Sequence, residues 1–182
     1  MAENQRILLT RRLLREGLLR ILAVKDIGNV SVAELCREAG INRVTFYRHY
    51  GCPKDVLTSI DEELLAQIQS EVKDERLSTR QHLEKLCVFL DEHAELVRIL
   101  LRNDSGKALE GVLVRLLRMF GPELRRLKSH FDEESFDLFI ETMAAGSNYL
   151  IRRWMLGGIK KTPQEMADFL YDATTHWWME ER

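Results

Sequence analysis

The chain has 182 residues, of which 45% are hydrophobic and 31% are charged, and its formal net charge is -2. This composition can form a packed core, and no apolar run approaches the roughly 18 residues that a membrane-spanning helix needs. Three cysteines without C-x-x-C spacing do not form a disulfide scaffold and are typical of a protein in the reducing cytoplasm, where we expect this chain.

Few residues interrupt helical periodicity, because the chain has only three prolines and ten glycines and hardly any alternating β-branched pattern. The sequence therefore predicts an all-α fold of about nine helices. The first helix is expected from about Asn4 to Asp26, where Leu14 and Leu18 lie on one apolar face.

Residues 31–50, SVAELCREAGINRVTFYRHY, carry the signals of two short helices joined by a tight turn. Ser31 followed by Glu34 forms a capping box, which predicts that the first of these helices has Ser31 as its N-cap. Gly40 can adopt a positive φ at the turn, and Asn42 can accept hydrogen bonds from the N–H groups that open the second helix. Together these signals predict a helix-turn-helix.

The second helix of this motif carries side chains that suit DNA. Val44 and one of the tyrosines that follow it are expected on its buried or half-buried side. Arg43 can bind guanine with two hydrogen bonds and Thr45 offers a hydroxyl and a methyl group, so these residues and His49 are candidates for base contacts. The alternative for His49 and Tyr47 is a packed or solvated surface position. The candidates for DNA contact are Ser31, Asn42, Arg43, Thr45, Tyr47, Arg48, His49 and Lys54, of which Ser31, Tyr47, Arg48 and Lys54 suit phosphate.

Charge is distributed unevenly along the chain. Residues 1–56 contain ten Lys or Arg and six Asp or Glu, whereas residues 57–182 contain 17 and 23. Only the N-terminal part therefore suits a polyanion such as DNA. We expect a helix-turn-helix domain over residues 1–56 and a helical body over residues 57–182.

Further helix starts and breaks follow the motif. Pro53 suits the first position of a fourth helix, and a capping box at Ser78 begins a fifth. A break at His93-Ala94 precedes a short sixth helix. A seventh, expected from Lys107 to His130, is interrupted at Gly121-Pro122, because proline removes a backbone donor. An eighth and a ninth helix are expected after Asp132 and Thr162.

These residues resemble the DNA-binding domain of TetR-family transcriptional regulators. The resemblance covers about residues 6–65 and is carried by Ala39-Gly40-Ile41 and by Phe46-Tyr47-Arg48-His49-Tyr50. One departure is the run Gly51-Cys52-Pro53-Lys54, in which the lysine that meets phosphate in the family stands one position later. The resemblance implies an N-terminal three-helix DNA-binding domain, a C-terminal ligand-binding and dimerisation domain, and a homodimer on double-stranded DNA with a near-palindromic operator.

The resemblance also implies that the last two helices pair across a two-fold axis. Apolar residues form wide stripes on both helices, and small residues such as Ser147 would permit close approach. The alternative is that the stripes pack inside one subunit. The candidates for the dimer interface are Phe136, Ile140, Met143, Ser147, Phe169, Ala173 and Trp177.

A small-molecule effector would, by the same resemblance, bind inside the body and release a repressor from its operator. Candidate pocket residues are Cys87, His93, Tyr149 and Trp154, although such residues on amphipathic helices are more often interfacial or capped. The alternative function is a TetR-like coactivator or interaction module whose body binds a protein partner. No zinc-binding H-E-x-x-H, glycine-rich phosphate loop or G-x-S-x-G is present, so we expect neither an enzyme nor a metal or cofactor.

Overall fold

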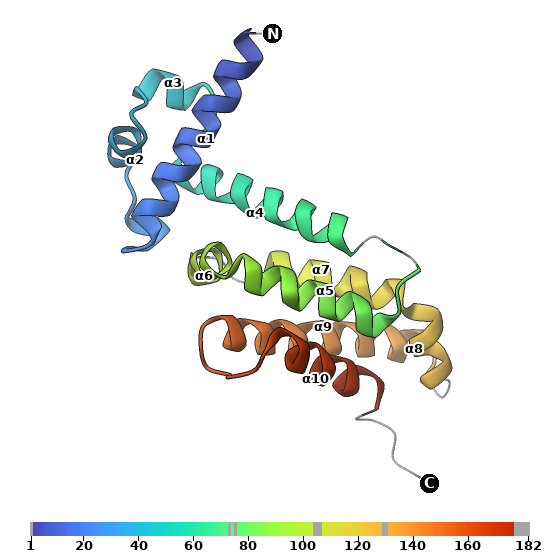
Figure 1. Cartoon of the computed structure of the whole chain (residues 1–182). Coiled ribbons are helices and arrows are strands. Elements are labelled where there is room, and N and C mark those ends of the chain that lie inside the picture. The colour runs from blue at the N-terminus through green and yellow to red at the C-terminus, as the bar shows by residue number, and fades with distance from the viewer. Residues whose placement is uncertain (1, 73, 75, 104–106, 129–130, 177–182) are drawn as a thin grey trace. The chain divides into compact units, whose positions relative to one another are not determined.

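The computed structural model describes residues 2–72, 74, 76–103, 107–128 and 131–176. Over these residues the chain forms ten α-helices, one short 3-10 helix at Ile27–Asn29 and no strand, so the predicted all-α fold is confirmed (Figure 1). The α-helices are α1 (Ala2–Leu22), α2 (Val32–Ala39), α3 (Arg43–Tyr47), α4 (Pro53–Glu71), α5 (Thr79–Glu92), α6 (Ala94–Asn103), α7 (Lys107–Met119), α8 (Gly121–Leu127), α9 (Glu133–Met155) and α10 (Pro163–Thr175).

One more α-helix is described than the nine expected, because the segment expected at Lys107–His130 is divided into α7 and α8. The division lies where the sequence places an interruption: Gly121 begins α8 and Pro122 stands in its first turn. A proline is tolerated there because the first N–H groups of a helix have no partner within the helix.

Local capping signals explain where most helices begin. The Ser78 hydroxyl accepts a hydrogen bond from the Gln81 N–H, and the Gln81 side chain accepts one from the Ser78 N–H, which completes the capping box of α5. Thr162 forms the same arrangement at α10, and Asp132 caps α9 through the Ser135 N–H at 2.8 Å. Such caps satisfy donors that would otherwise lack a partner, so a short sequence pattern predicts the helix start.

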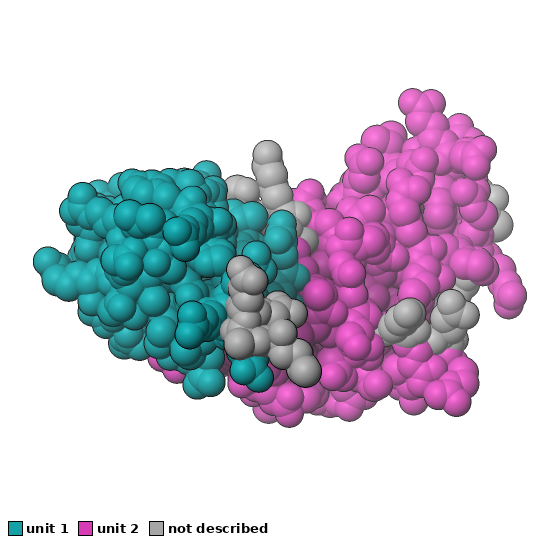
Figure 2. All heavy atoms as spheres, turned by 90° about the horizontal axis from the view of Figure 1, so that it is seen from above, with its two compact units in different colours: residues 1–64, 99–104 teal, residues 65–98, 105–182 magenta. Residues whose placement is uncertain are grey.

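The chain forms two compact units, which Figure 2 distinguishes by colour. Unit 1 comprises residues 1–64 and 99–104, and unit 2 comprises residues 65–98 and 105–182. In unit 1 the Ile27 N–H donates to the Asn103 side-chain oxygen at 2.7 Å. The functional division expected at residue 56 stays a prediction.

The core of unit 1 is built from one or two fully buried side chains of each helix. They include Leu14 and Leu18 of α1, Leu35 of α2, Phe46 of α3 and Val56 of α4. Helices α1 and α2 pack against each other. Their closest approach is at Gly17, where an added Cβ would lie 3.2 Å from atoms of Ala39.

Replacing Gly17 by valine is therefore expected to destabilise unit 1, because the added side chain meets backbone atoms of α2 that cannot rotate away. Overpacking of this kind costs about 1 to 3 kcal/mol. Gly111 in α7 is the matched control, since a Cβ there meets nothing within 4 Å. Gly111→Ala should leave stability unchanged or raise it by about 0.5 to 1 kcal/mol. Urea unfolding followed by circular dichroism measures both variants, and a Gly17→Val protein as stable as the parent would contradict the packing argument.

In unit 2, helix α5 packs on α10 and α7 packs on α9. Fully buried residues such as Leu86 of α5, Leu113 of α7 and Ile140 of α9 contribute to its core. Cys87 is also fully buried, and burial raises the pKa of its thiol to about 12. In the part of the chain that the structure describes, no helix has the length and apolar character needed to cross a membrane.

Candidate nucleic-acid interface

Helix α2, the turn and α3 have the geometry that the sequence predicts for a helix-turn-helix. The Ser31 hydroxyl caps α2 by accepting from the Glu34 N–H at 3.2 Å. Gly40 ends α2 with a φ of 67°, a conformation that other residues rarely adopt. The Asn42 side-chain oxygen then caps α3 by accepting from the Thr45 N–H at 2.7 Å. The turn is therefore held by local hydrogen bonds at both of its ends.

Helix α3 is short and is anchored by one aromatic side chain. Phe46 is 0% exposed, and its ring lies edge-on to Tyr47 with centroids 5.4 Å apart. Tyr50 is half-buried on another side of Phe46, and its hydroxyl lies 3.3 Å from the Ser59 hydroxyl of α4. These contacts fix the orientation of α3 within unit 1.

The structure corrects the expectation for Val44, which is 68% exposed. Phe46 occupies the buried side of α3, and a residue two positions earlier on a helix points in a different direction. The exposed side of the motif therefore presents Arg43, Val44, Tyr47 and Arg48, with Thr45 and His49 half-exposed at its edge. Arg48 is the C-cap of α3, so it and His49 follow the helix instead of continuing it.

Positive charge in unit 1 is neutralised in one region and left open in another. Ion pairs join Arg12 to Glu16, Arg15 to Glu63, Arg20 to Glu38 and Lys25 to Glu34. These pairs hold three of the five arginines of α1 and the lysine that follows the helix. By contrast, Arg43, Arg48 and Lys54 are exposed and form no ion pair with another described residue. Open positive charge therefore lies at α3 and at the start of α4, and also at the exposed Arg6 and Arg11 of α1 and Arg37 of α2, which form no ion pair with another described residue.

The start of α4 keeps its geometry despite the unusual Gly51-Cys52-Pro53-Lys54 run. Pro53 is the first residue of α4 and is buried, whereas Lys54 is exposed. The Asp55 carboxylate accepts from the N–H groups of Cys52 and Gly51 at 2.9 and 2.8 Å, and these bonds lower its pKa. A carboxylate is thereby held at the positive end of the helix. Lys54 remains available for contact with phosphate.

The candidates for the dimer interface are placed differently from one another. Phe136 and Ile140 are buried inside the subunit, so they belong to its own core. Met143, Ser147 and Ala173 are half-buried and Phe169 is exposed. Trp177 lies outside the described residues. The fully exposed side of α9 instead carries Leu138, Thr142, Ala145, Gly146 and Tyr149.

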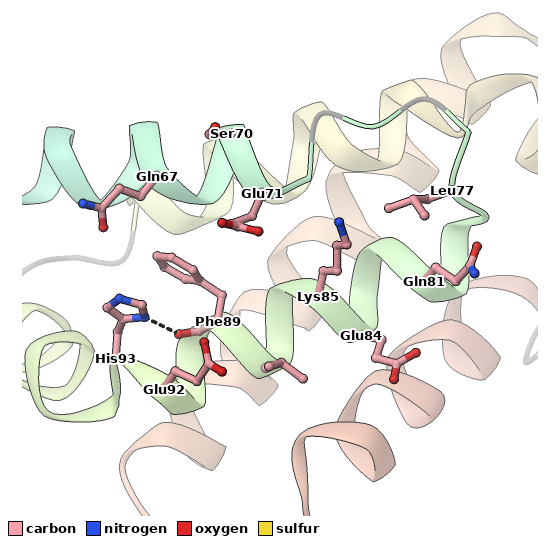
Figure 3. Close-up of a pocket in the computed structure, with 11 residues that line it drawn as sticks. Gln67, Ser70, Glu71, Leu77, Gln81, Glu84, Lys85, Phe89, Glu92 and His93 are labelled. Atoms are coloured by element: carbon pink, nitrogen blue, oxygen red, sulfur yellow. Dashed lines mark hydrogen bonds between the residues drawn. The ribbon is translucent and has the colours of Figure 1, made fainter.

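The four candidate pocket residues lie in different surroundings among the described residues of unit 2. Cys87 is enclosed in the core, Tyr149 is exposed on α9, and the buried Trp154 ring donates its N–H to the Lys161 carbonyl at 2.8 Å. His93 lines a hollow of about 710 Å³ between the end of α4 and α5 (Figure 3). Its Nδ1 lies 2.9 Å from the Phe89 carbonyl, as the dashed line in Figure 3 marks.

Residues 78–176, more than half of the chain, match the TetR-family model described as the transcriptional regulator C-terminal region. The chain belongs to the TetR family of transcriptional regulators. Members of this family are generally non-enzymatic transcription factors. Among the described residues, no group of three or more His, Cys, Asp or Glu side chains could hold a metal ion.

Solved structures share this TetR fold over nearly the whole chain. The TetR transcriptional regulator from Streptococcus agalactiae 2603V has a TM-score of 0.77 and 16% identity, over 97% of this chain and 99% of that chain. The dihydroxyacetone kinase operon activator DhaS has a TM-score of 0.64 and 16% identity, over 91% and 93%. A gamma-butyrolactone receptor described as ArpA-like has a TM-score of 0.56 and 16% identity, over 93% and 99%.

Two features of this TetR-family chain escaped the sequence-based prediction. Val44 is exposed between Arg43 and Thr45, where an apolar side chain can contact the methyl group of thymine. Leu138 and Tyr149 are 58% and 60% exposed on α9, although the sequence does not single out Leu138 and indicates Tyr149 as a candidate pocket residue. In α3 and in α9, apolar residues occur on more than one side of the helix. This pattern could have indicated that some of them are exposed.

Proposed function

We propose that the protein regulates transcription as a homodimer that inserts α3 of each subunit into successive major grooves of a near-palindromic site. The observation that carries this proposal is that Arg43, Arg48 and Lys54, around a helix that Phe46 anchors, are exposed and form no ion pair with another described residue. In this proposal Arg43, Val44, Thr45 and His49 read base edges, and Asn42 stands beside them as the N-cap of the helix.

A second group of residues is assigned to phosphate contacts, which set the position of the protein along the DNA duplex. Tyr47 and Arg48 are exposed at the end of α3, and Lys54 is exposed in the first turn of α4. Ser31 is also exposed, although its hydroxyl already caps α2. These groups can bind the backbone on either side of the groove that α3 enters.

Dimerisation is assigned to the exposed sides of α9 and α10. Leu138, Ala145 and Tyr149 place apolar surface in water on α9, and Phe169 and the half-buried Ala173 do so on α10. Gly146 adds no side chain, and a Cβ there would meet nothing within 4 Å, so a second backbone can approach. A two-fold interface would cover these surfaces on both subunits at once.

Repression released by an effector is the proposed mode of regulation, and one resemblance supports it. One similar structure is a gamma-butyrolactone receptor, and another is an operon activator. The second supports the alternative, in which this chain activates transcription or binds a protein partner through its body. The hollow of about 710 Å³ beside His93 is lined by Glu71, Glu84 and Glu92 and could take either kind of partner.

The test of DNA binding is selection of sites from a random duplex library by the full-length protein. A near-palindromic motif with half-sites one or more helical turns apart is expected. Enrichment of no motif would overturn the proposal. The selected site then serves as the operator for the variants below.

Arg43→Ala should weaken binding to the selected operator by roughly 1 to 3 kcal/mol per contact, because a bidentate bond to a base is lost. It should also relax the preference at one base position in each half-site. Arg76→Ala is the matched control, since Arg76 belongs to unit 2 and its side chain is exposed beside Asp74. Fluorescence anisotropy with operator variants measures both. Unchanged affinity and base preference for Arg43→Ala would exclude the assigned role of Arg43.

Lys54→Ala should lower the salt dependence of binding without changing base preference. A phosphate contact releases counterions, so the slope of log K against log salt should fall by about 1 for each contact that is lost. Titrations at several salt concentrations give the slope, and Arg76→Ala again serves as the control. A slope equal to that of the parent would indicate that Lys54 makes no phosphate contact.

A further inference from the structure

Unit 2 contains a second hollow, of about 670 Å³, at the N-terminal end of α5 and the junction of α7 with α8. One half of its lining is apolar and the other half is polar. Its eight lining residues are Leu77, Ser78, Thr79, His82, Met119, Phe120, Pro122 and Arg126. None of these residues is acidic, in contrast to the hollow beside His93.

His82 lines this hollow and has a buried ring nitrogen without a hydrogen-bond partner. The side chain is 1% exposed, and its ring packs against Phe120 with centroids 5.0 Å apart. Nδ1 lies 2.9 Å from the Ser78 carbonyl, which can only accept, so Nδ1 carries the proton. Nε2 is buried and has no hydrogen-bond partner. A buried polar atom without a partner is costly, and a ligand that supplies one would be favoured.

The hydrogen bond of Nδ1 fixes the orientation of the imidazole. Because Nδ1 is bonded to the carbonyl of the preceding turn of α5, Nε2 lies on the side of the ring that faces away from the backbone of α5. With the proton on Nδ1, Nε2 of the neutral ring is an acceptor, so it donates to a carboxylate only when binding of the acid brings a proton to the ring. The hydrogen bond to Ser78 fixes the ring for that contact.

Arg126 and the N-terminal end of α5 make the same hollow favourable for an anion. Arg126 is exposed at its edge and forms no ion pair with another described residue. Ser78 and Thr79 are the N-cap and first residue of α5, a helix of 14 residues whose N-terminal end favours anions. The nearby Asp74 carboxylate is bound by Arg76 at 2.9 and 3.0 Å, so its charge is already neutralised.

We propose that this hollow binds an organic acid with a short apolar body. The carboxylate would contact Arg126 and the Nε2–H of protonated His82, and the apolar body would pack on Met119, Phe120 and Leu77. A volume of this size suits a small molecule, and the polar half of the lining would fix its orientation. This inference rests on the effector-responsive function proposed above and names the site and the chemical class of the effector.

Isothermal titration calorimetry of the full-length protein with hexanoate, without DNA and at pH 6, tests the inference. Hexanoate should bind saturably, with one site per chain. Acetate lacks the apolar body and hexanamide lacks the charge, so each should bind at least about tenfold more weakly. Equal affinity for hexanamide would overturn the assignment to an anion.

Variants locate the site. His82→Leu and Arg126→Ala should each weaken hexanoate binding about tenfold, and His82→Gln should restore part of the loss because it keeps a donor. Arg118→Ala is the matched control, since it removes an exposed arginine of α7 that pairs with Asp137 at 3.3 Å. Arg126 is exposed, so Arg126→Ala gives a result even if His82→Leu does not fold. No saturable binding, or equal binding by the parent and Arg126→Ala, would overturn the proposal. Operator binding is measured separately, so these outcomes leave the DNA-binding proposal standing.

Discussion

Ala145→Glu is expected to convert the protein into monomers that retain their helicity and bind the operator far more weakly. Ala145 is exposed on α9, with Leu138 and Tyr149 on the same side of the helix. Around a two-fold axis each substitution occurs twice, so two carboxylates would come close together and lose water. A monomer also has only one helix-turn-helix and therefore keeps only half of the DNA contacts. Light scattering gives the mass of each variant, and anisotropy gives its affinity for the operator.

Val24→Glu is the matched control for this prediction. It adds the same charge at an apolar residue that is 85% exposed in unit 1, outside α9 and α10. Its mass should remain that of a dimer. A monomer mass for the parent chain at micromolar concentration would contradict the dimer, and with it the mechanism of two half-sites. A dimer mass for Ala145→Glu would instead place the interface on another surface.

The starts of the helices were predictable because their causes are local. A Ser78, Asp132 or Thr162 side chain caps the helix that follows it through groups three residues away. The positive φ of Gly40 and the place of Pro53 are equally local consequences of residue type. For the same reason the helix-turn-helix could be placed from 20 consecutive residues.

The direction of helix faces was less predictable, because it depends on what each helix packs against. Helix α9 has apolar residues on more than one side, and contact with α7 accompanies burial of Ile140 while Leu138 stays exposed. On α3, either Val44 or Phe46 could have been the buried apolar residue. In the structure Phe46 is buried and Val44 is exposed. Likewise, no local pattern indicates that Nε2 of His82 lacks a partner, since that depends on the packing of α5, α7 and α8.

Phe46→Ala is expected to remove about 3 to 5 kcal/mol from the stability of unit 1, because a fully buried ring is replaced by a cavity. That loss is comparable with the whole stability of a small domain. The five residues of α3 have too few turns to form a helix alone, so the recognition surface should lose its order. Operator binding should therefore be abolished.

Tyr47→Ala separates this structural effect from the loss of a contact. Tyr47 is the next residue along α3 and is 59% exposed, so its removal should change stability by no more than about 0.5 kcal/mol. Its operator affinity should nevertheless fall, because a candidate phosphate contact is lost. Urea unfolding and anisotropy on both variants give the comparison. If Phe46→Ala bound the operator as tightly as Tyr47→Ala, the anchoring of α3 by Phe46 would not be what orients Arg43 toward the bases.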